Sequence, residues 1–446
     1  MTAKTRRRVL QGTAVAGLAS LTGCQALLGG GQGQSEIDAS GTAQQVDGVP
    51  EDPVTLAFID FYSGAGSVYG EATKNATQLL IDDINANGGL VGKRPIEPQW
   101  IDEAADPSQL QEQLRSLSTG DGAHAVIGIT SSGTVEALAP MAADLNQLLI
   151  THIAGSHKTR DDLFVENDPT FVFRTGPLTT VDGLAPAYYL HEDKPDLTSI
   201  AGLNQDYSWG RFTFEWFKRG LQSLNPDVEV VSERFPPTFS GQLSSHIDAL
   251  LEADPEAIYC SMWGTDLTNF LNKGMSKGLF DGREVILPIG DLAIQNVEMP
   301  DGAIIGGSGR AQFNYLRDER STVDDFVSAY VEAYDSPPEY PAWHAHDALA
   351  FYVRAVDKYV ALTGQWPSQE QMALSLEGTA IEAPWGAVSM PHHEAKRPCF
   401  VGRATSTPAY EYKTVTETKT HPAVRLNPPA GVLTEDWIDD LDTSFL

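Results

Sequence analysis

From Val54 onward, short apolar runs typical of buried strands alternate with segments whose apolar residues recur at helical spacing. The runs VTLAFID (Val54–Asp60), AVIGI (Ala125–Ile129) and LLITH (Leu148–His152) predict strands. Between the first two, residues Glu71–Asn85 place their apolar side chains on one face, which predicts a helix. Successive strand–helix units of this kind predict a parallel sheet with helices on both faces.

The alternation starts again after Gly176. Strands are predicted at Thr198–Leu203, Ala257–Met262 and Val285–Ile289, and a helix at Arg211–Leu224. The folded part, roughly 390 residues, exceeds what one hydrophobic core usually holds. The sequence therefore predicts an α/β protein with two doubly wound parallel-sheet lobes.

The first 24 residues have the layout of an export signal. Three arginines (Arg6–Arg8) precede an apolar run, Val9–Leu21, that is too short to span a bilayer. The paired arginines resemble a twin-arginine signal, and LTGC resembles a lipobox whose cysteine, Cys24, is lipidated. A short anchor that is never cleaved is the alternative. Residues 25–52, rich in Gly, Gln and Ser, predict a flexible linker between membrane and folded domain.

The net charge of the chain limits the partners and the environment that are expected for the folded part. The chain carries 60 acidic and 30 basic side chains, a formal net charge of −30 at pH 7. Such a surface repels nucleic acid and anionic lipid, so neither is expected as a partner. A globular protein that is this acidic resembles proteins of salt-loving archaea. Apart from Cys24, the chain has only Cys260 and Cys399, which cannot build a disulfide framework.

Four sequence motifs occur in the same order as in a known protein family. They are IDDINANGGLVGKRPIEPQWIDEAADPSQ, AVIGITSSGT, DYSWG and APWGAVSM, and they extend over roughly residues 53–405. Together they resemble type I periplasmic binding proteins, and more narrowly the branched-chain amino acid and amide receptors that feed ABC transporters. The last 40 residues have no clear counterpart in this pattern.

The resemblance implies two lobes that are joined by three chain crossings and close on a ligand between them. The crossings are expected near Arg174–Pro177, Gly306–Arg310 and Ala380–Pro384. Accordingly, the first lobe is expected to comprise residues 53–175 and 310–380, and the second lobe residues 176–309 and 381–446. In open α/β sheets ligands bind outside the carboxyl ends of the strands, which would place the cleft between the lobes.

Ser131 and Ser132 are the first candidates for ligand contacts. With Gly133 and Thr134 they lie between the strand Ala125–Ile129 and a helix that begins near Val135. Backbone N–H groups and hydroxyls at a helix N-terminus form a natural carboxylate site. Plain helix capping explains the same cluster without a ligand.

Aromatic residues form a second group of candidates. Trp209 in DYSWG and Trp263 after AIYCSM leave second-lobe strands on the cleft side, where their rings are able to stack on a ligand. Tyr69 lies in the first turn of the first lobe, where the resemblance implies a pocket aromatic. Core packing is the alternative for Trp263.

The resemblance also implies a site for a ligand ammonium group. It assigns the carbonyl of Ala154 and the hydroxyl of Ser156, which follow the strand LLITH, to that group. Asp291, after LPIG at the end of a second-lobe strand, is the acid expected to pair with it. A solvated surface acid is the alternative for Asp291.

The sequence shows no catalytic or cofactor-binding motif that would favour an enzyme over a receptor. Gly64–Gly70 lacks the dinucleotide-binding spacing, Gly128–Gly133 is not a hydrolase elbow, and His392–Glu394 lacks zinc-site spacing. We therefore expect no cofactor, no metal and no enzymatic activity.

The expected protein is a lipid-anchored receptor on the extracellular face of the membrane. It is expected to bind a small amino acid of the branched-chain type and to deliver it to ABC permease subunits. The alternatives are a urea or short-chain amide receptor of the same fold, a tethered extracellular sensor, or a secreted hydrolase.

Overall fold

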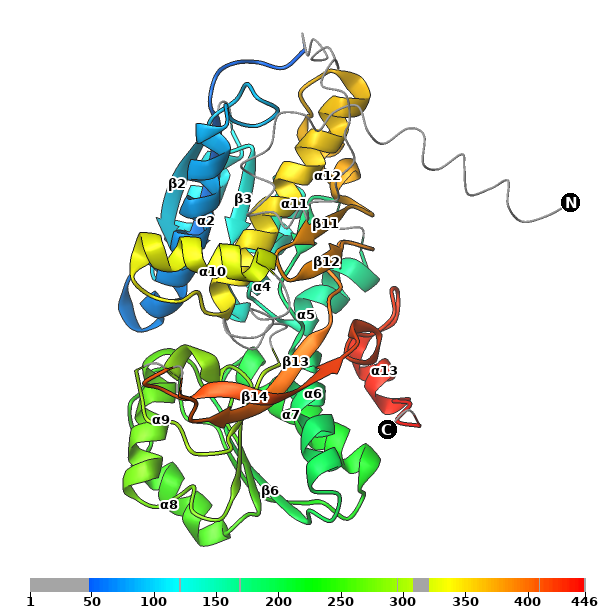
Figure 1. Cartoon of the computed structure of the whole chain (residues 1–446). Coiled ribbons are helices and arrows are strands. Elements are labelled where there is room, and N and C mark those ends of the chain that lie inside the picture. Colours follow the sequence, from blue (N-terminus) through cyan, green and yellow to red (C-terminus); the bar gives the residue numbers. More distant parts are fainter. Residues whose placement is uncertain are drawn as a thin grey trace, which may run out of the picture.

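A computed structural model describes residues 48–119, 122–167, 170–294, 296–307, 321–408 and 410–444. The expected export signal with Cys24, most of the expected linker and the Arg310 end of the second crossing lie outside the described residues. Two lobes are stacked one on the other (Figure 1). Among the described helices, none combines the length and apolar character needed to cross a bilayer.

The first lobe is built on a five-stranded parallel sheet in the order β2-β1-β3-β4-β5. Its buried apolar runs explain why it is covered on both faces. Helices α2, α10, α11 and α12 cover one face, and α3 and α4 cover the other. The bounds are β1 (Val54–Asp60), β2 (Ile96–Asp102), β3 (Ala125–Gly128), β4 (Leu149–Thr151), β5 (Val172–Arg174), α2 (Ser67–Ala86), α3 (Pro107–Leu117), α4 (Ser132–Asp144), α10 (Ser321–Tyr334), α11 (Tyr340–Thr363) and α12 (Gln369–Leu376).

The second lobe holds a seven-stranded sheet in the order β14-β13-β10-β9-β8-β6-β7. Five strands are parallel, whereas β13 and β14 are antiparallel additions at one edge. Helices α6 and α7 cover one face, and α8 and α9 the other, so both lobes are doubly wound as predicted. The bounds are β6 (Ser199–Leu203), β7 (Glu229–Arg234), β8 (Ala257–Tyr259), β9 (Glu284–Leu287), β10 (Ile304–Ile305), β13 (Cys399–Thr405), β14 (Thr414–His421), α6 (Thr179–Asp193), α7 (Ser208–Leu224), α8 (Ser244–Ala253) and α9 (Gly264–Ser276).

A small hairpin corrects the expected position of the third crossing. Strands β11 (Ala380–Ala383) and β12 (Gly386–Ser389) form a separate two-stranded sheet and pack beside α11 in the first lobe. Trp385 stacks on Trp343 at a centroid distance of 4.5 Å, within the first-lobe core. The prediction of a crossing near Ala380–Pro384, with the second lobe resuming at residue 381, was wrong. The alternating apolar side chains of the hairpin are needed to complete the first-lobe core, and the chain enters the second-lobe sheet only at β13.

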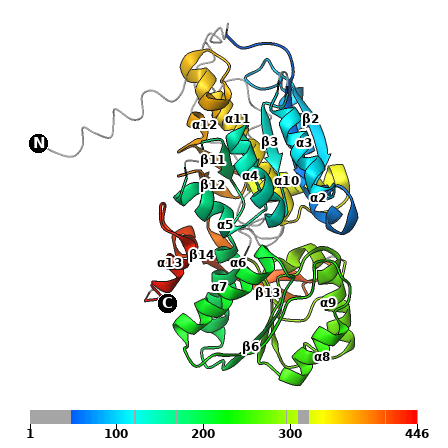
Figure 2. The ribbon, with the colours of Figure 1, turned by 180° about the vertical axis from the view of Figure 1, so that it is seen from behind.

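The C-terminal segment runs beside the lobe crossings and contacts both lobes. It contains η4 (Ala423–Arg425) and α13 (Thr434–Asp439), and both ribbon views place α13 near the crossings (Figures 1 and 2). Its residues Leu426 and Ile438 pack into the second-lobe core. From the first lobe, Arg160 donates to the carbonyl of Val432 at 2.6 Å and to that of Pro429 at 2.8 Å.

Candidate ligand-binding site between the lobes

A cavity lies where the carboxyl ends of the two sheets face each other. Its empty volume is about 270 Å³, which includes open solvent at its mouth. The first lobe contributes residues that follow β3 and β4 and residues at the starts of α2 and α11, and the second lobe contributes residues that follow β6, β8 and β9. This interlobe pocket is lined by Tyr69, Thr130, Ser132, Ile153, Tyr207, Trp209, Trp263, Ile289 and Tyr340.

Aromatic rings from both lobes wall the pocket and contact each other across the lobe boundary. Tyr69 of the first lobe meets Trp263 of the second edge-on at 5.2 Å, and Tyr340 meets Tyr69 at 5.8 Å. The indole of Trp263 donates to the hydroxyl of Tyr207 at 2.7 Å, and that of Trp209 donates to a backbone carbonyl at 3.1 Å. These bonds fix both indoles, so the walls lose little side-chain entropy when a ligand binds.

A polar contact also joins the two lobes beside the pocket. The carboxylate of Glu136, on α4, accepts hydrogen bonds from Ser156 of the first lobe at 2.5 Å and from Ser208 of the second at 2.7 Å. Together with the ring contacts, this bond holds the lobes against each other over the cavity. The structure is therefore a closed arrangement of the two lobes.

The helix N-terminus that the sequence marked as a carboxylate site already holds a carboxylate of the protein. Glu103, just past the end of β2, accepts from the backbone N–H of Thr130 at 2.8 Å and from that of Ser131 at 2.9 Å. Its side chain is buried, and burial together with the nearby charge of Asp60 raises its pKa to about 8, against the opposing effect of its hydrogen bonds. Ser131 thus contributes its N–H to Glu103, whereas Ser132 lines the pocket.

A second buried carboxylate lies behind Thr130. Asp60, the last residue of β1, accepts hydrogen bonds from the hydroxyls of Thr130 and of Thr73, the latter at 2.7 Å. The ring nitrogen Nε2 of His152 lies 2.9 Å from the same carboxylate. Thr130 therefore links the pocket surface to the acids Glu103 and Asp60 behind it.

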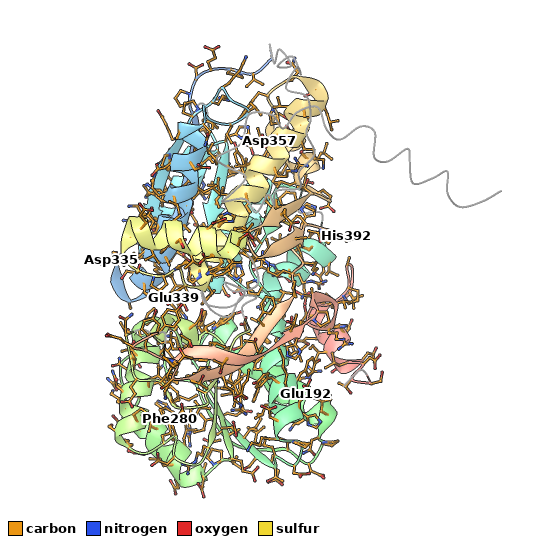
Figure 3. All side chains as sticks on the ribbon, in the orientation of Figure 1. Glu192, Phe280, Asp335, Glu339, Asp357 and His392 are labelled. Carbon is orange, nitrogen blue, oxygen red and sulfur yellow. The ribbon has the colours of Figure 1, made fainter. Side chains whose placement is uncertain are left out.

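Asp291 is buried beside the tyrosines of the pocket and is not part of its lining. It lies in η3 (Gly290–Ala293), and its charge helps to raise the pKa of Tyr69, of Tyr340 and of Glu339, although burial is the larger cause in each case. Glu339 lies at the junction of the lobes, whereas Asp357, on the same side of the first lobe, lies farther from it (Figure 3). Because Asp291 is buried, the alternative that it is a solvated surface acid is excluded.

Six of the eight predicted residues line one of two cavities, and Ser131 and Asp291 line neither. Four of them, Tyr69, Ser132, Trp209 and Trp263, line the interlobe pocket. Ala154 and Ser156 instead line a neighbouring cavity inside the first lobe, which also contains Arg174.

Sequence reasoning missed five lining residues of the pocket, including Ile153 and Ile289, and it also missed Glu103 behind the lining. Thr130, Tyr207, Tyr340 and Glu103 all lie at strand ends or helix starts, and Tyr207 is part of the DYSWG motif itself. Strand-end position would have marked Thr130, Tyr207 and Glu103. Tyr340 comes from a helix more than 200 residues away from β1 in sequence, and no local pattern indicates it.

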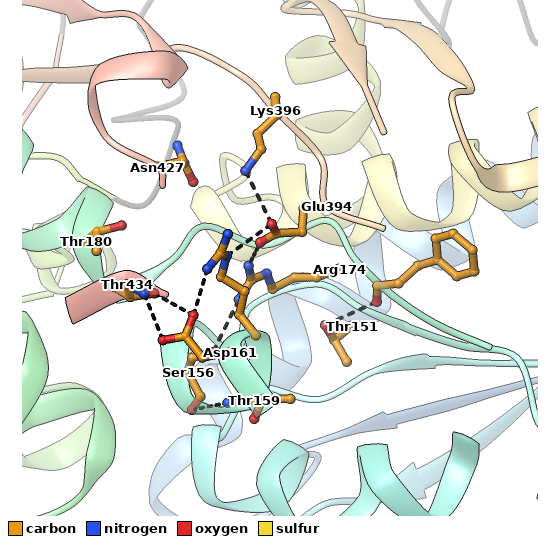
Figure 4. A network of polar contacts seen from close by, with 12 residues as sticks. Thr151, Ser156, Thr159, Asp161, Arg174, Thr180, Glu394, Lys396, Asn427 and Thr434 are labelled. Carbon is orange, nitrogen blue, oxygen red and sulfur yellow. Dashed lines mark hydrogen bonds and ion pairs between the residues drawn. The ribbon is translucent and has the colours of Figure 1, made fainter. Parts of the chain in front are cut away.

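The lobe crossings carry a separate network of buried charges (Figure 4). Glu394 forms ion pairs with Arg174, with Arg160 at 3.3 Å and with Lys396 at 3.6 Å. These cations lower the pKa of Glu394 even though the side chain is buried. Asp161 extends the network to the C-terminal segment by accepting from the backbone N–H and the hydroxyl of Thr434 at 3.0 and 2.9 Å.

The chain matches a protein-family model, several curated sequence relatives and several solved structures. The family model described as periplasmic binding protein matches residues 53–409. A Leu/Ile/Val-binding protein of Rhizobium johnstonii is 27% identical over 41% of this chain and 48% of its own length. The leucine-specific-binding protein of Salmonella typhimurium is 27% identical over 56% of this chain and 65% of its own length. The chain thus spans about half to two thirds of the length of these curated relatives.

Solved structures match over nearly the whole fold. A solute-binding protein from Rhodopseudomonas palustris, in complex with 3,4-dihydroxybenzoic acid, has a TM-score of 0.73 at 19% identity and covers 86% of this chain and all of its own. A leucine-, isoleucine-, valine-, threonine- and alanine-binding protein from Brucella ovis, in its closed conformation, has a TM-score of 0.69 at 19% identity, with 85% and 97% covered.

The chain belongs to the periplasmic binding protein family, and its two doubly wound lobes have the type I arrangement. Both the predicted family and the predicted fold class are confirmed. Membership in a family of binding proteins also agrees with the expectation of a receptor rather than an enzyme.

Proposed function

We propose that this protein is the solute receptor of an ABC importer. The observation that carries the proposal is the interlobe pocket, which is walled by residues of both lobes at the carboxyl ends of both sheets. A ligand in this position contacts both lobes only when they are closed, so binding favours the closed state. Permease subunits that distinguish closed from open receptors would then receive loaded protein.

The family relatives support a small amino acid of the branched-chain type as ligand. On that reading, Tyr69, Trp209 and Trp263 pack against the apolar side chain. Asp291, buried behind Tyr69, supplies negative charge for the ammonium group. Ala154 and Ser156 lie in the neighbouring cavity, and their proposed contact with the ammonium group requires a ligand that reaches past Ile153.

A urea or short-chain amide receptor is the second candidate, and one observation favours it. Glu103 already occupies the backbone N–H groups of Thr130 and Ser131, so these two groups are not free to bind an amino acid carboxylate. An amide or urea carries no carboxylate and has N–H groups that carboxylates and hydroxyls accept readily.

The sequence also supports a proposal for the location of the receptor. We propose that lipidated Cys24 anchors the protein to the extracellular face of the membrane, with residues 25–52 as a flexible tether. The net charge of −30 supports a protein adapted to high salt. A tethered sensor would share the anchor and the pocket but would signal to a membrane receptor and not to a permease.

A thermal-shift screen in molar salt tests the function directly. Amino acids, short amides and urea are added singly, and a binder raises the melting temperature because it stabilises only the folded state. Stoichiometric binding without turnover supports a receptor. If no compound of these classes shifts the transition, the proposed ligand range is wrong, and catalytic turnover of a bound compound would overturn the receptor.

A further inference from the structure

We propose that glycines on the facing surfaces of the two lobes set how far the lobes close, and with it the ligand affinity of the interlobe pocket. The main positions are Gly66 in the first lobe and Gly264 in the second. Neither residue lines the pocket itself. This inference rests on the proposed receptor function, because it takes closure of the lobes to be coupled to ligand binding.

The two glycines lie where a loop of the first lobe meets a helix of the second. The loop is η1 (Gly64–Gly66), which follows β1 and contacts α9 across the lobe boundary. A Cβ atom at Gly264, the first residue of α9, would lie 2.5 Å from the carbonyl oxygen of Ala65. A Cβ atom at Gly66 would lie 3.0 Å from Cζ3 of Trp263. Non-bonded carbon atoms prefer separations of about 3.5–4.0 Å, so alanine fits at neither position while the lobes are closed.

The loop on the first-lobe side is held in place from below. Asp102, at the end of β2, accepts a hydrogen bond from the backbone N–H of Tyr62 at 3.0 Å. The same carboxylate accepts from the hydroxyl of Ser63, the residue directly before the loop, at 2.5 Å. These bonds tie the loop to the neighbouring strand, so it cannot move aside without breaking them.

The facing surface of the second lobe is fixed in a similar way. Asp266, buried in the first turn of α9, accepts from the backbone N–H of Phe239 at 2.6 Å and from the side chain of Gln205 at 2.8 Å. The ring of Trp263 meets Phe239 edge-on at 4.8 Å, and its indole N–H is bonded to Tyr207. Because both surfaces are fixed, a clash between them is relieved by separation of the lobes.

A third glycine follows the same pattern. A Cβ atom at Gly155, which follows β4 in the first lobe, would lie 3.1 Å from Cζ3 of Trp209 in the second. Trp209 and Trp263 both line the pocket, so a first-lobe glycine lies against each of these two indoles. A ligand gains its contacts with both lobes only in the closed state. Its apparent affinity therefore falls by the same factor as the population of that state.

Disulfide trapping measures closure without any ligand. Ser156 of the first lobe and Ser208 of the second donate to the same carboxylate oxygen of Glu136. The parent protein for the assay combines Ser156→Cys and Ser208→Cys, a pair that comes together only when the lobes are closed. Oxidised glutathione supplies the oxidant, and peptide masses after digestion identify the bond. The native cysteines Cys260 and Cys399 are buried and do not compete.

Three glycine variants are compared in this parent. Gly264→Ala is expected to slow trapping about tenfold or more, and Gly66→Ala by a smaller factor. Gly241→Ala is the matched control: Gly241 and Gly264 have φ angles of +66° and +59°, but a Cβ atom at Gly241 would meet nothing within 4 Å. The control thus carries the backbone strain of Gly264→Ala without its contact, and it is expected to trap at the parent rate. Gly66 has a φ of −97°, so Gly66→Ala adds the contact without such strain.

Ligand affinity is the second measurement, made without the two cysteine substitutions. Leucine, isobutyramide and urea are titrated calorimetrically into wild type, Gly264→Ala, Gly66→Ala and Gly241→Ala in molar salt. Each compound that binds the wild type is expected to bind Gly264→Ala about tenfold more weakly or worse, and to bind Gly241→Ala as it binds the wild type.

Each result decides for or against the inference. Trapping and affinity at the level of Gly241→Ala in both other variants overturn it and leave the receptor function standing. A parent protein that forms no disulfide between the lobes, with or without these compounds, overturns it as well. If Gly264→Ala does not fold, Gly66→Ala decides by the same measurements. Failure of the receptor function looks different, because then no compound of the wider screen shifts the melting temperature while trapping still separates the glycine variants.

Discussion

Two buried glutamates of the first lobe have the same exposure and opposite electrostatics. Glu103, at the pocket, and Glu394, at the lobe crossings, are each 3% exposed. The pKa of Glu103 is raised to about 8, whereas that of Glu394 is lowered. Both lose water on burial, and the difference comes from their partners: backbone N–H groups and a neighbouring acid for Glu103, two arginines and a lysine for Glu394.

The comparison shows that burial alone does not assign a role to a charged residue. Glu394 neutralises cations from three parts of the chain and ties the lobe crossings together, which is a structural role. Burial and the charge of Asp60 raise the pKa of Glu103, with no arginine or lysine among the groups that shift it, and Glu103 lies behind Thr130 of the pocket. Buried acids without cationic compensation are typical of functional sites.

The sharpest test of the structural role is Glu394→Gln. It leaves Arg160 and Arg174 buried without their shared carboxylate, and removing one partner of a buried ion pair costs about 3–5 kcal/mol. Urea-induced unfolding in molar salt measures the loss. Glu382→Gln, at an exposed position of β11, is the control and should stay within about 0.5 kcal/mol of the wild type. Equal stability of Glu394→Gln and the control would refute the structural role.

The pH dependence of stability should differ in sign between the two glutamates. The folded-state pKa of Glu103, about 8, lies above its ordinary value of 4.5, so the folded state binds its proton more tightly. This contribution is fully present below pH 4.5 and is lost as the pH rises towards 8, by at most about 1.4 kcal/mol per pH unit. Glu394, with its pKa lowered, instead contributes stability above its ordinary pKa that is lost as the pH falls.

Unfolding curves between pH 4.5 and 8 of wild type and Glu103→Gln measure the first effect. The stability difference between the two proteins should shift with pH in favour of Glu103→Gln as the pH rises. Parallel pH profiles would show that Glu103 titrates normally.

The link between the crossings and the C-terminal segment is expected to have a smaller effect. Thr434→Ala removes the hydroxyl that donates to Asp161 at 2.9 Å and leaves the backbone bond in place. The loss of one such bond costs about 1 kcal/mol, which unfolding in urea resolves. Thr265→Ala, at an exposed position of α9, is the control. A loss no larger than that of the control would mean that the segment is held by its apolar contacts with the second lobe alone.

The smallest effect is expected at the polar contact beside the pocket. Ser208→Ala removes the bond from the second lobe to Glu136, which exists only while the lobes are closed. Ligand affinity should fall two- to tenfold, in line with one hydrogen bond, while the melting temperature without ligand changes little. Titration with the best compound of the screen measures this, and Ser245→Ala, exposed on α8, is the matched control. Unchanged affinity would show that this bond does not contribute to closure.

Local pattern was enough to predict much of the fold and part of the site. Alternation of strand and helix patterns predicted both doubly wound lobes, because side-chain periodicity reports which face of an element is buried. Strand-end position then predicted Ser132, Trp209 and Trp263, which line the pocket, since the carboxyl ends of parallel strands meet at one edge of a sheet. Tyr69 was predicted from the family resemblance and not from its position after a strand.

Only the tertiary structure decided the contacts between residues that are distant in sequence. The hairpin of β11 and β12 has the alternation of any half-buried strand pair, and only packing against α11 assigns it to the first lobe. Glu103 reaches the turn after β3 because β1 lies between β2 and β3 in the sheet, which brings their ends together. Glu394 finds its arginines in the same way, across more than 200 residues. Periodicity reports burial within one element, whereas the partners of a buried charge depend on the spatial order of elements, which no local pattern encodes.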